Sequence, residues 1–233
     1  MTPATSPVSG YMPHPTMVDF PAHMAAVFVL PGCNFRCAFC HNSSLWQPRE
    51  TFGWDRLEQI CHRFLDLWVD GAVVSGGEPT LQPALPELLQ FLRRQSFAVK
   101  LDTNGGRPDV LRRVMALVDY VAMDIKCSLE QYPKVTGFAD TALVAESIAL
   151  IKAEAPDYEF RTTVVEAIHT DDEIQSILEL ARGARRFVLQ PFLPREDLPD
   201  ASLRQAPRTS PVRLKTLAER FRGAVTDVVV RGV

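Results

Sequence analysis

The chain has 233 residues, of which 46% are hydrophobic and 23% are charged, and its formal net charge at pH 7 is −3. This composition is typical of an ordinary globular protein that is long enough to bury a substantial core. The slight acidic excess argues against a nucleic-acid-binding surface, which normally carries a basic excess. No apolar run approaches the roughly 20 residues that a membrane-spanning helix requires. We therefore expect no nucleic-acid partner and no membrane association.

The start of the chain and its cysteine content indicate where the protein works. The opening sequence MTPATSPVSGYMPHPT has no basic start followed by an apolar stretch, so it does not resemble a secretory signal. Five cysteines, three of them clustered, do not suggest a disulfide framework in a chain of this size. A reducing, cytoplasmic location is the expectation. Residues 1–22 are rich in Pro, Thr and Ser, which predicts an extended, partly disordered lead-in.

Short apolar runs then alternate with longer amphipathic runs along the chain. The apolar runs are typical of buried strands, and the longer runs have apolar residues at helical spacing. The first expected helix places Leu57, Ile60, Phe64, Leu67 and Trp68 on one stripe. In chain order, the expected strands are 25–30, 72–75, 97–103, 120–125, 158–165, 185–190 and 225–232, and the expected helices are 54–69, 85–95, 108–118, 141–155, 171–183 and 210–223.

Six or seven strand-then-helix units in one run predict an α/β fold. Because the expected strands are apolar throughout rather than alternating, they indicate a parallel sheet covered by helices. Right-handed crossovers let such units curl into a full or partial barrel. No linker divides the chain, so one domain is expected. Ligands bind at the carboxyl ends of parallel strands, and the unusual segments fall there: 33–40, 75–80, 102–105, 123–126 and Arg161.

Three of the cysteines, Cys33, Cys37 and Cys40, directly follow the first expected strand. Their C-x3-C-x2-C spacing lets three thiolates converge on one small object. A structural zinc site takes four protein ligands, and iron–sulfur clusters usually take four thiolates. His41 follows Cys40 directly and is poorly placed to reach the same ion. A cubane cluster with one iron free for a non-protein ligand fits this pattern, and zinc or three unrelated buried cysteines are the alternatives.

The segment GCNFRCAFCHN resembles the cluster-binding loop of the radical S-adenosylmethionine (SAM) enzymes. In that family three cysteines hold a [4Fe–4S] cluster, and the amine and carboxylate of SAM bind the fourth iron. An aromatic residue before the third cysteine is usual there, and Phe39 occupies that place. The resemblance implies that Cys33, Cys37 and Cys40 ligate the cluster and that Phe39 and His41 lie near SAM.

Further segments resemble SAM-contacting motifs of the same family, and each has an ordinary alternative. SGGEPT (75–80) resembles the glycine-rich SAM motif and alone would indicate a turn. DTNG (102–105) resembles the segment that faces the ribose and alone would indicate an Asn-Gly turn. MDIK (123–126) resembles a D-x-K motif near the methionine portion, with a solvated strand end as the alternative. Arg161 matches an arginine that approaches SAM and would otherwise pair with an acidic neighbour.

These motifs give a set of expected SAM contacts. Gly76 and Gly77 permit positive φ and close backbone approach. Glu78 is expected to favour the SAM ammonium, and Lys126 suits a carboxylate. The residues implied by the resemblance are Phe39, His41, Gly76, Gly77, Glu78, Pro79, Asp102, Thr103, Asn104, Asp124, Lys126 and Arg161.

The resemblance narrows to activating enzymes of glycyl-radical proteins. It looks closest to anaerobic ribonucleoside-triphosphate reductase activating proteins of the pyruvate formate-lyase-activating type, and it covers roughly residues 17–193. It implies a partial (β/α)6 barrel of parallel strands with helices outside, plus a C-terminal helix-strand extension. In domain terms, an extended lead-in over 1–22 precedes one radical SAM domain over 23–233, whose core ends at about 193 and whose extension is 194–233.

Some features depart from this branch of the family. The segment LQPFLP (189–194) stands where relatives carry a histidine that touches the adenine side, so Gln190 or Phe192 would have to serve. Ala22 follows Pro21 where Pro-Gly is usual. The chain lacks an inserted Cys-rich ferredoxin-like segment, and its two remaining cysteines are expected to be structural: Cys61 and Cys127.

The resemblance implies an oxidoreductase that works anaerobically. It would reductively cleave SAM to a 5′-deoxyadenosyl radical, which takes hydrogen from a glycine of a partner glycyl-radical enzyme. A flavodoxin- or ferredoxin-like protein would donate the electron, and no catalytic residue is implied beyond the cluster and SAM. The Pro-rich segment 191–211 is a candidate lid or docking surface, or else a plain solvated connector. The alternatives are a radical SAM enzyme acting on a small molecule or peptide, similar to 7-carboxy-7-deazaguanine synthase, and a non-catalytic metal-binding protein.

Overall fold

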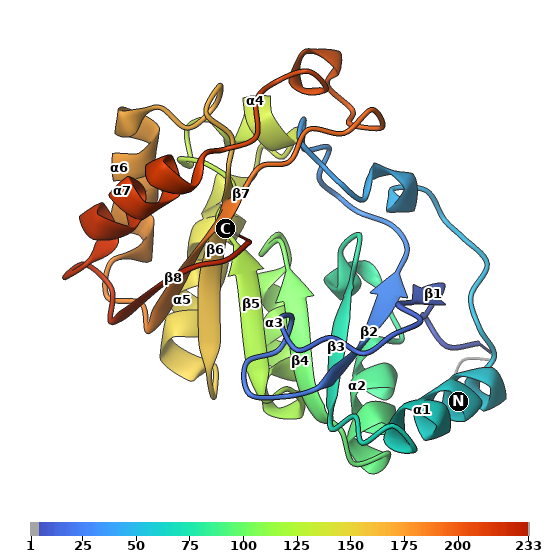
Figure 1. Ribbon diagram of the computed structural model, residues 1–233. Coiled ribbons are helices and arrows are strands. Elements are labelled where there is room, and N and C mark those ends of the chain that lie inside the picture. Colours follow the sequence, from blue (N-terminus) through green and yellow to red (C-terminus); the bar gives the residue numbers. More distant parts are fainter. Residues whose placement is uncertain (1–4, 233) are drawn as a thin grey trace.

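The strands of the computed structural model, which describes residues 5–232, lie side by side in the order in which they occur in the chain (Figure 1). The first pair is antiparallel, and every later pair is parallel. The predicted parallel sheet is therefore confirmed. The strands are β1 (Gly10–Tyr11), β2 (Ala25–Leu30), β3 (Gly71–Gly76), β4 (Ala98–Thr103), β5 (Tyr120–Asp124), β6 (Tyr158–Val164), β7 (Arg186–Pro191) and β8 (Asp227–Val230).

Helices cover the outer face of this curved sheet, so the expected α/β partial barrel is confirmed (Figure 1). Among the described residues, β1 and β8 do not pair with each other, and the barrel stays open on that side. No helix in the described part of the chain is long and apolar enough to cross a bilayer. The α-helices are α1 (Trp54–Leu65), α2 (Leu85–Arg94), α3 (Pro108–Val114), α4 (Tyr132–Thr136), α5 (Thr141–Glu154), α6 (Asp171–Ala181) and α7 (Pro211–Phe221), and the 3-10 helices are η1 (Ser43–Leu45), η2 (Pro79–Leu81), η3 (Met115–Leu117) and η4 (Ala201–Leu203).

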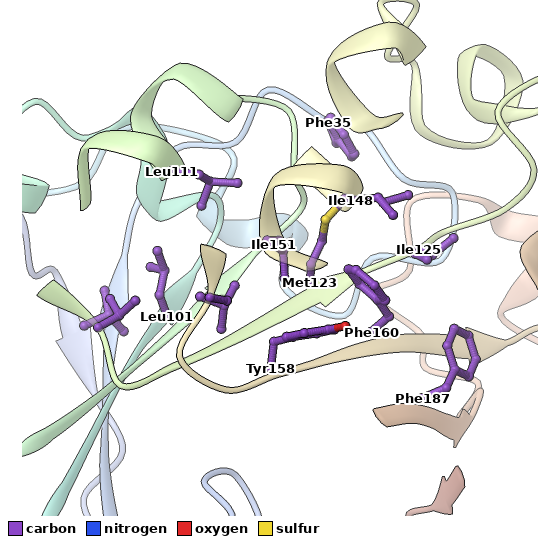
Figure 2. Close-up of a cluster of buried hydrophobic side chains, with 14 of the residues drawn as sticks. Phe35, Leu101, Leu111, Met123, Ile125, Ile148, Ile151, Tyr158, Phe160 and Phe187 are labelled. Atoms are coloured by element: carbon purple, nitrogen blue, oxygen red, sulfur yellow. The ribbon is translucent and has the colours of Figure 1, made fainter. Parts of the chain in front are cut away.

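The main hydrophobic core lies between the sheet and its helices. Leu101, Met123 and Phe160 come from neighbouring strands, and Ile148 and Ile151 come from α5 (Figure 2). Successive side chains of a strand point to opposite faces. The residues that alternate with these core positions therefore face the inside of the curve.

A smaller apolar cluster fills the inside of the curve near the amino ends of the strands. Ala25 and Tyr120 are the first residues of β2 and β5, and both are buried in it. Phe20, from the lead-in, packs into the same cluster. The amino ends of the strands are therefore closed on this side by mostly apolar side chains.

The lead-in packs more closely than the sequence suggested. It is extended, but it contains β1, which was not predicted, and Val8 and Phe20 are buried. Thr16 and Ala25 exchange backbone hydrogen bonds of 2.9 and 2.8 Å. The expectation of partial disorder is therefore wrong for residues 5–22, while residues 1–4 lie outside the described part.

Helix α1 ends at Leu65, short of the predicted end at 69. Trp68 adopts a φ of 63°, and such left-handed residues commonly terminate helices. Leu67 and Trp68 are consequently 55% and 89% exposed. The predicted apolar stripe is wrong for these two residues and confirmed for its buried members, Leu57, Ile60 and Phe64.

Candidate active site

The loops at the carboxyl ends of the parallel strands surround a cavity of about 200 Å³. The cysteine loop after β2 supplies one part of its lining, and residues from the ends of β3 to β6 supply another. Most of the predicted site residues are thus brought together. Those that line the cavity are Cys33, Cys37, Phe39, Cys40, His41, Gly76, Gly77, Asp102, Thr103, Asn104, Asp124, Lys126 and Arg161.

The backbone of the cysteine loop is held by the short helix α4. The amide of Arg36 donates to the carbonyl of Thr136 at 2.6 Å, and the amide of Ala38 donates to that of Val135 at 3.1 Å. The Arg36 guanidinium also donates to the Cys33 carbonyl at 2.7 Å. The loop shape therefore depends on an element that lies about 100 residues further along the chain.

The three loop thiols differ in burial. Cys37 is buried, whereas Cys33 and Cys40 are half-buried. Burial raises the pKa of the Cys37 thiol to about 12, and burial also raises the pKa of Cys33. Metal binding has to displace these protons, because the thiolate is the ligand form.

The thiols line the cavity without meeting at one point. Within residues 5–232, no group of three or more His, Cys, Asp or Glu side chains is placed to hold a single metal ion. A four-iron cluster is a larger object that takes one cysteine thiolate at each ligated iron. Three thiols that line one cavity fit such a cluster.

His41 lines the cavity, and its imidazole ring contacts the segment after β7. Its Nε2–H donates to the Leu193 carbonyl at 2.8 Å, and its ring stacks on Phe192 with centroids 6.0 Å apart. Phe192 is buried, whereas Gln190 lines the cavity. Of the two residues expected to replace the missing adenine-side histidine, Gln190 is therefore the accessible one.

Gly76 and Gly77 are required by close approach of the chain to itself. A Cβ at Gly76 would lie 2.2 Å from the Leu30 carbonyl oxygen, and one at Gly77 would lie 2.0 Å from that of Gly32. Gly76 also has a φ of 130°, which confirms the expected positive value. The two glycines therefore allow the end of β3 to pack directly against the backbone at the start of the cysteine loop.

Glu78 is fully buried and lies behind the cavity wall, as does Pro79. One carboxylate oxygen accepts from the Thr80 amide at 3.1 Å and the Thr103 hydroxyl at 2.8 Å, and the other accepts from the Asn104 amide at 2.6 Å. Burial raises the pKa of Glu78, and these donors oppose that rise. The sequence predicts that Glu78 lines the cavity, where it could contact an ammonium group. The structure instead places its carboxylate between the β3 loop and the β4 loop, which it joins.

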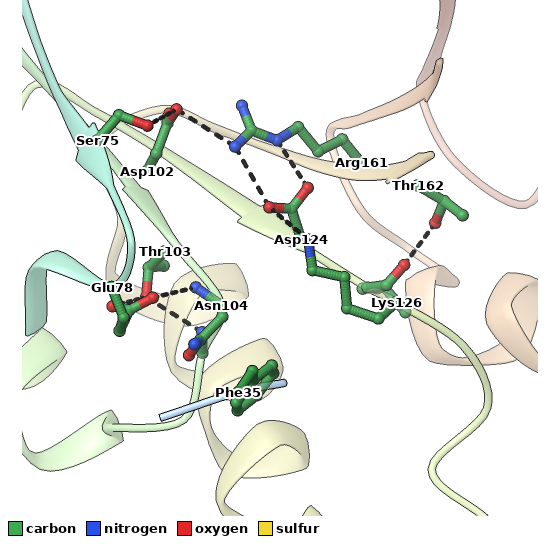
Figure 3. Close-up of polar contacts among 12 residues, drawn as sticks. Phe35, Ser75, Glu78, Asp102, Thr103, Asn104, Asp124, Lys126, Arg161 and Thr162 are labelled. Atoms are coloured by element: carbon green, nitrogen blue, oxygen red, sulfur yellow. Dashed lines mark hydrogen bonds and ion pairs between the residues drawn. The ribbon is translucent and has the colours of Figure 1, made fainter. Parts of the chain in front are cut away.

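A chain of alternating charges crosses β4, β5 and β6, and Figure 3 shows most of it. Lys100 Nζ lies 2.8 Å from Asp102 Oδ1, and Arg161 Nη2 lies 3.2 Å from Asp102 Oδ2. Arg161 Nε is 2.8 Å from Asp124 Oδ1, and Lys126 Nζ is 3.1 Å from Asp124 Oδ2. These five side chains, three cations and two anions, together carry a formal charge of +1.

Both carboxyl groups in this row of charged side chains remain ionised. Burial alone would raise the pKa of Asp124, but Arg161 and Lys126 outweigh burial and hold that pKa well below its usual range. Arg161 and Lys100 likewise lower the pKa of Asp102 against the effect of burial. Arg161 thus pairs with acidic neighbours, as its alternative interpretation predicted, and also lines the cavity. The solvated alternative is wrong for Asp124 and Lys126, whose side chains are 17% and 19% exposed.

Five residues that line this cavity are absent from the contacts expected from the sequence, although Phe35 and Ser75 lie within the expected segments. Strand alternation could have found Thr163, because it lies two positions beyond Arg161 on β6 and therefore faces the same side. No comparable signal marks the aromatic residues. The five are Phe35, Asn42, Trp46, Ser75 and Thr163.

A second cavity of about 590 Å³ adjoins the first and shares His41, Arg161, Thr163 and Gln190 with it. The lead-in borders this cavity on one side, and the residues after β7 and β8 border it on the other. It therefore lies on the open side of the barrel. The residues that it does not share with the first cavity are Val18, Asp19, Pro191, Leu193, Arg231 and Gly232.

Residues 27–181 match the model of the radical SAM superfamily. The chain belongs to this superfamily and is a radical SAM enzyme, a class that uses a [4Fe–4S] cluster and SAM. It is 30% identical over 93% of its length to a putative glycyl-radical enzyme activating enzyme of Methanocaldococcus jannaschii, of which it covers 92%. It is 29% identical to the pyruvate formate-lyase-activating enzyme of Streptococcus mutans, over 75% of this chain and 73% of that one.

Other relatives share less of the chain or only its fold. The 7-carboxy-7-deazaguanine synthase of Neisseria meningitidis is 36% identical over 47% of this chain and 48% of its own. The structure of Streptococcus suis SuiB bound to the precursor peptide SuiA superposes with a TM-score of 0.70 at 14% identity, over 88% of this chain and 48% of that one. At this identity the likeness concerns the fold alone.

Proposed function

We propose that this protein activates a glycyl-radical enzyme by taking a hydrogen atom from a glycine Cα of that partner. One observation carries the proposal: three thiols and a chain of charged side chains face one cavity, and a larger cavity beside it lies on the open side of the barrel. When bound, the cluster and SAM supply a 5′-deoxyadenosyl radical through one-electron cleavage of the SAM sulfonium. The protein supplies binding, orientation and exclusion of water.

The residues of the first cavity divide into two groups in this proposal. Cys33, Cys37 and Cys40 ligate three irons and leave the fourth for SAM. The row of charged side chains across β4, β5 and β6 holds SAM, because its formal charge of +1 favours an anionic group such as the methionine carboxylate. Lys126 and Arg161 are its cavity-lining cations, and both are oriented by Asp124. Asp102 and Thr103 face the ribose. No acid–base pair is needed, because a hydrogen atom moves rather than a proton.

The second cavity supports a polypeptide as the substrate. At about 590 Å³ it exceeds the first, and its lining includes exposed apolar side chains at Val18 and Leu193, which are 72% and 43% exposed. The Thr163 hydroxyl and the Gln190 amide, shared with the first cavity, are suited to bind a peptide backbone. Two relatives, which match this chain over 93% and 75% of its length, are named as activating enzymes. A glycine-bearing loop of a partner protein is the occupant that we propose.

The first experiment tests cofactor binding. The chain is reconstituted with iron and sulfide without oxygen and is then reduced chemically, in place of the flavodoxin- or ferredoxin-like donor that we propose. We expect a brown protein that releases 5′-deoxyadenosine from SAM. Cys37→Ala should lose both properties, whereas Cys61→Ala, which removes a buried thiol of α1, should keep them. A cluster that survives Cys37→Ala contradicts the ligand assignment.

The second experiment tests the substrate. A glycyl-radical enzyme encoded in the same genome is labelled with deuterated glycine and mixed with the reduced, reconstituted protein and SAM. We expect deuterium in 5′-deoxyadenosine and a glycyl-radical signal in electron paramagnetic resonance. If 5′-deoxyadenosine forms without deuterium in the presence of this partner, the activase proposal fails. A small-molecule reaction, as the likeness to 7-carboxy-7-deazaguanine synthase suggests, then becomes the better interpretation.

A further inference from the structure

The sulfur of Cys33 receives two N–H donors. The backbone amide of Phe35 donates to Cys33 Sγ at 3.4 Å, and the side-chain amide of Asn104 donates to it at 3.8 Å. Among the described residues, no side-chain amide donates to the sulfur of Cys37 or Cys40. The three loop cysteines are therefore unequal, and Asn104, in the loop after β4, makes the difference.

The orientation of the Asn104 amide is determined by its other partners. Its Oδ1 accepts from the Gly106 amide at 2.8 Å, and its Nδ2 donates to Asn34 Oδ1 at 2.8 Å. An inverted amide would set its oxygen against the Asn34 oxygen and its NH2 against the Gly106 N–H, so the network allows one orientation. The second hydrogen of Nδ2 remains for Cys33.

The Asn104 backbone is also fixed. Its amide donates to the buried Glu78 carboxylate at 2.6 Å (Figure 3), and the residue is 6% exposed. A donor that is immobile and sheltered from water interacts strongly with negative charge, because little solvent screens it. Asn104 is therefore a pre-oriented donor aimed at one cysteine sulfur.

We propose that Asn104 is a positioning residue that raises the reduction potential of the cluster by donating to Cys33 Sγ. The inference rests on the proposed role of Cys33 as a cluster ligand. Reduction adds one electron from an external low-potential donor, and no bond breaks in that step. The cysteine sulfurs carry part of the added negative charge, and N–H donors to them stabilise the reduced state. The family resemblance implied only a contact between this segment and the SAM ribose.

The test is a redox titration of the reconstituted protein, followed by the electron paramagnetic resonance signal of the reduced cluster. At the wild-type midpoint, Asn104→Ala should show about a tenfold lower ratio of reduced to oxidised cluster, which corresponds to about 59 mV for one electron. Asn42→Ala is the matched control, because Asn42 lines the same cavity and, among the described residues, its side chain makes no hydrogen bond to a cysteine sulfur. The midpoint of this variant should stay at the wild-type value. A wild-type midpoint in Asn104→Ala overturns the proposal.

A second variant separates this role from folding of the loop. Asn104→Ser keeps the backbone bond to Glu78 and a side-chain acceptor for Gly106, but its hydroxyl is on a shorter side chain and does not replace the amide N–H that reaches Cys33 Sγ. It should shift the midpoint in the same direction as Asn104→Ala. If both variants lose the cluster, Asn104 serves loop folding and the proposal is wrong. If the wild-type chain itself assembles no cluster, the assignment of Cys33 as a ligand fails instead.

Discussion

Ala22 adopts a φ of 65°, a left-handed conformation that its Cβ disfavours by about 1–2 kcal/mol. The residue is exposed, so its methyl group contributes little packing. We expect Ala22→Gly to stabilise the protein by about 0.5–1 kcal/mol, because relief of this strain exceeds the extra entropy of glycine in the unfolded chain. Urea unfolding followed by tryptophan fluorescence measures the change. Ala22→Val should shift the midpoint the opposite way, and equal midpoints for Gly and Ala would contradict the strain.

The same residue shows what sequence comparison can reveal about a single position. The sequence shows that Pro21-Ala22 replaces the usual Pro-Gly. It does not show the positive φ at this position, which explains why glycine is usual there. Glu78 shows the opposite limit. Its motif was recognisable, yet its burial depends on donors from Thr103 and Asn104, which another loop brings to it. Partners of this kind cannot be inferred from spacing along one segment.

At the scale of elements, the apolar runs predicted every parallel strand, since burial on both faces leaves a continuous signal. β1 was missed because Gly10–Tyr11 is too short to show a period, and its pairing with β2 holds it in place. Helix α4 was missed for the same reason, although it fixes the cysteine loop. Elements of two to five residues depend on tertiary contacts that local sequence does not encode.

One such contact joins two loops at the carboxyl ends of β5 and β6. His169 is 1% exposed; its Nδ1 accepts from the Val165 amide at 2.8 Å, and its Nε2–H donates to the Lys126 carbonyl at 2.8 Å. The imidazole is therefore neutral, with its hydrogen on Nε2. Burial lowers the pKa of His169 below its ordinary value of about 6.5.

This histidine should make stability depend on pH. Below about pH 6.5 the unfolded chain binds a proton at His169 that the folded chain does not, so stability falls as the pH falls, by up to about 1.4 kcal/mol per pH unit, until the folded pKa is reached. Urea unfolding of the metal-free chain between pH 7.5 and 5 measures this slope. His169→Gln should flatten it, whereas His62→Gln, at an exposed position of α1, should not. The same slope in both variants would show that other groups cause the acid sensitivity.

At the scale of the whole molecule, the lead-in and the C-terminal segment border the open side of the barrel. Val18 and Asp19 lie on one side of the second cavity, and Arg231 and Gly232 lie on the other. The C-terminal segment is anchored by pairing of β8 with β7 and by one ion pair that reaches across to β6. The width of the proposed substrate entrance therefore depends on how firmly this segment is held.

The ion pair joins Arg231 to Glu159, whose carboxylate is fully buried. The guanidinium makes two bonds of 2.7 and 2.6 Å to it, and the Tyr120 hydroxyl adds a third at 3.0 Å. Arg231→Ala leaves a buried charge without its cation and should destabilise the protein by about 3–5 kcal/mol. A second change, Glu159→Gln, should recover part of this loss. Arg222→Ala breaks an exposed pair with Glu219 and should cost at most about 1 kcal/mol. If urea unfolding gives equal losses for Arg231→Ala and Arg222→Ala, the C-terminal anchor is not a buried ion pair in solution.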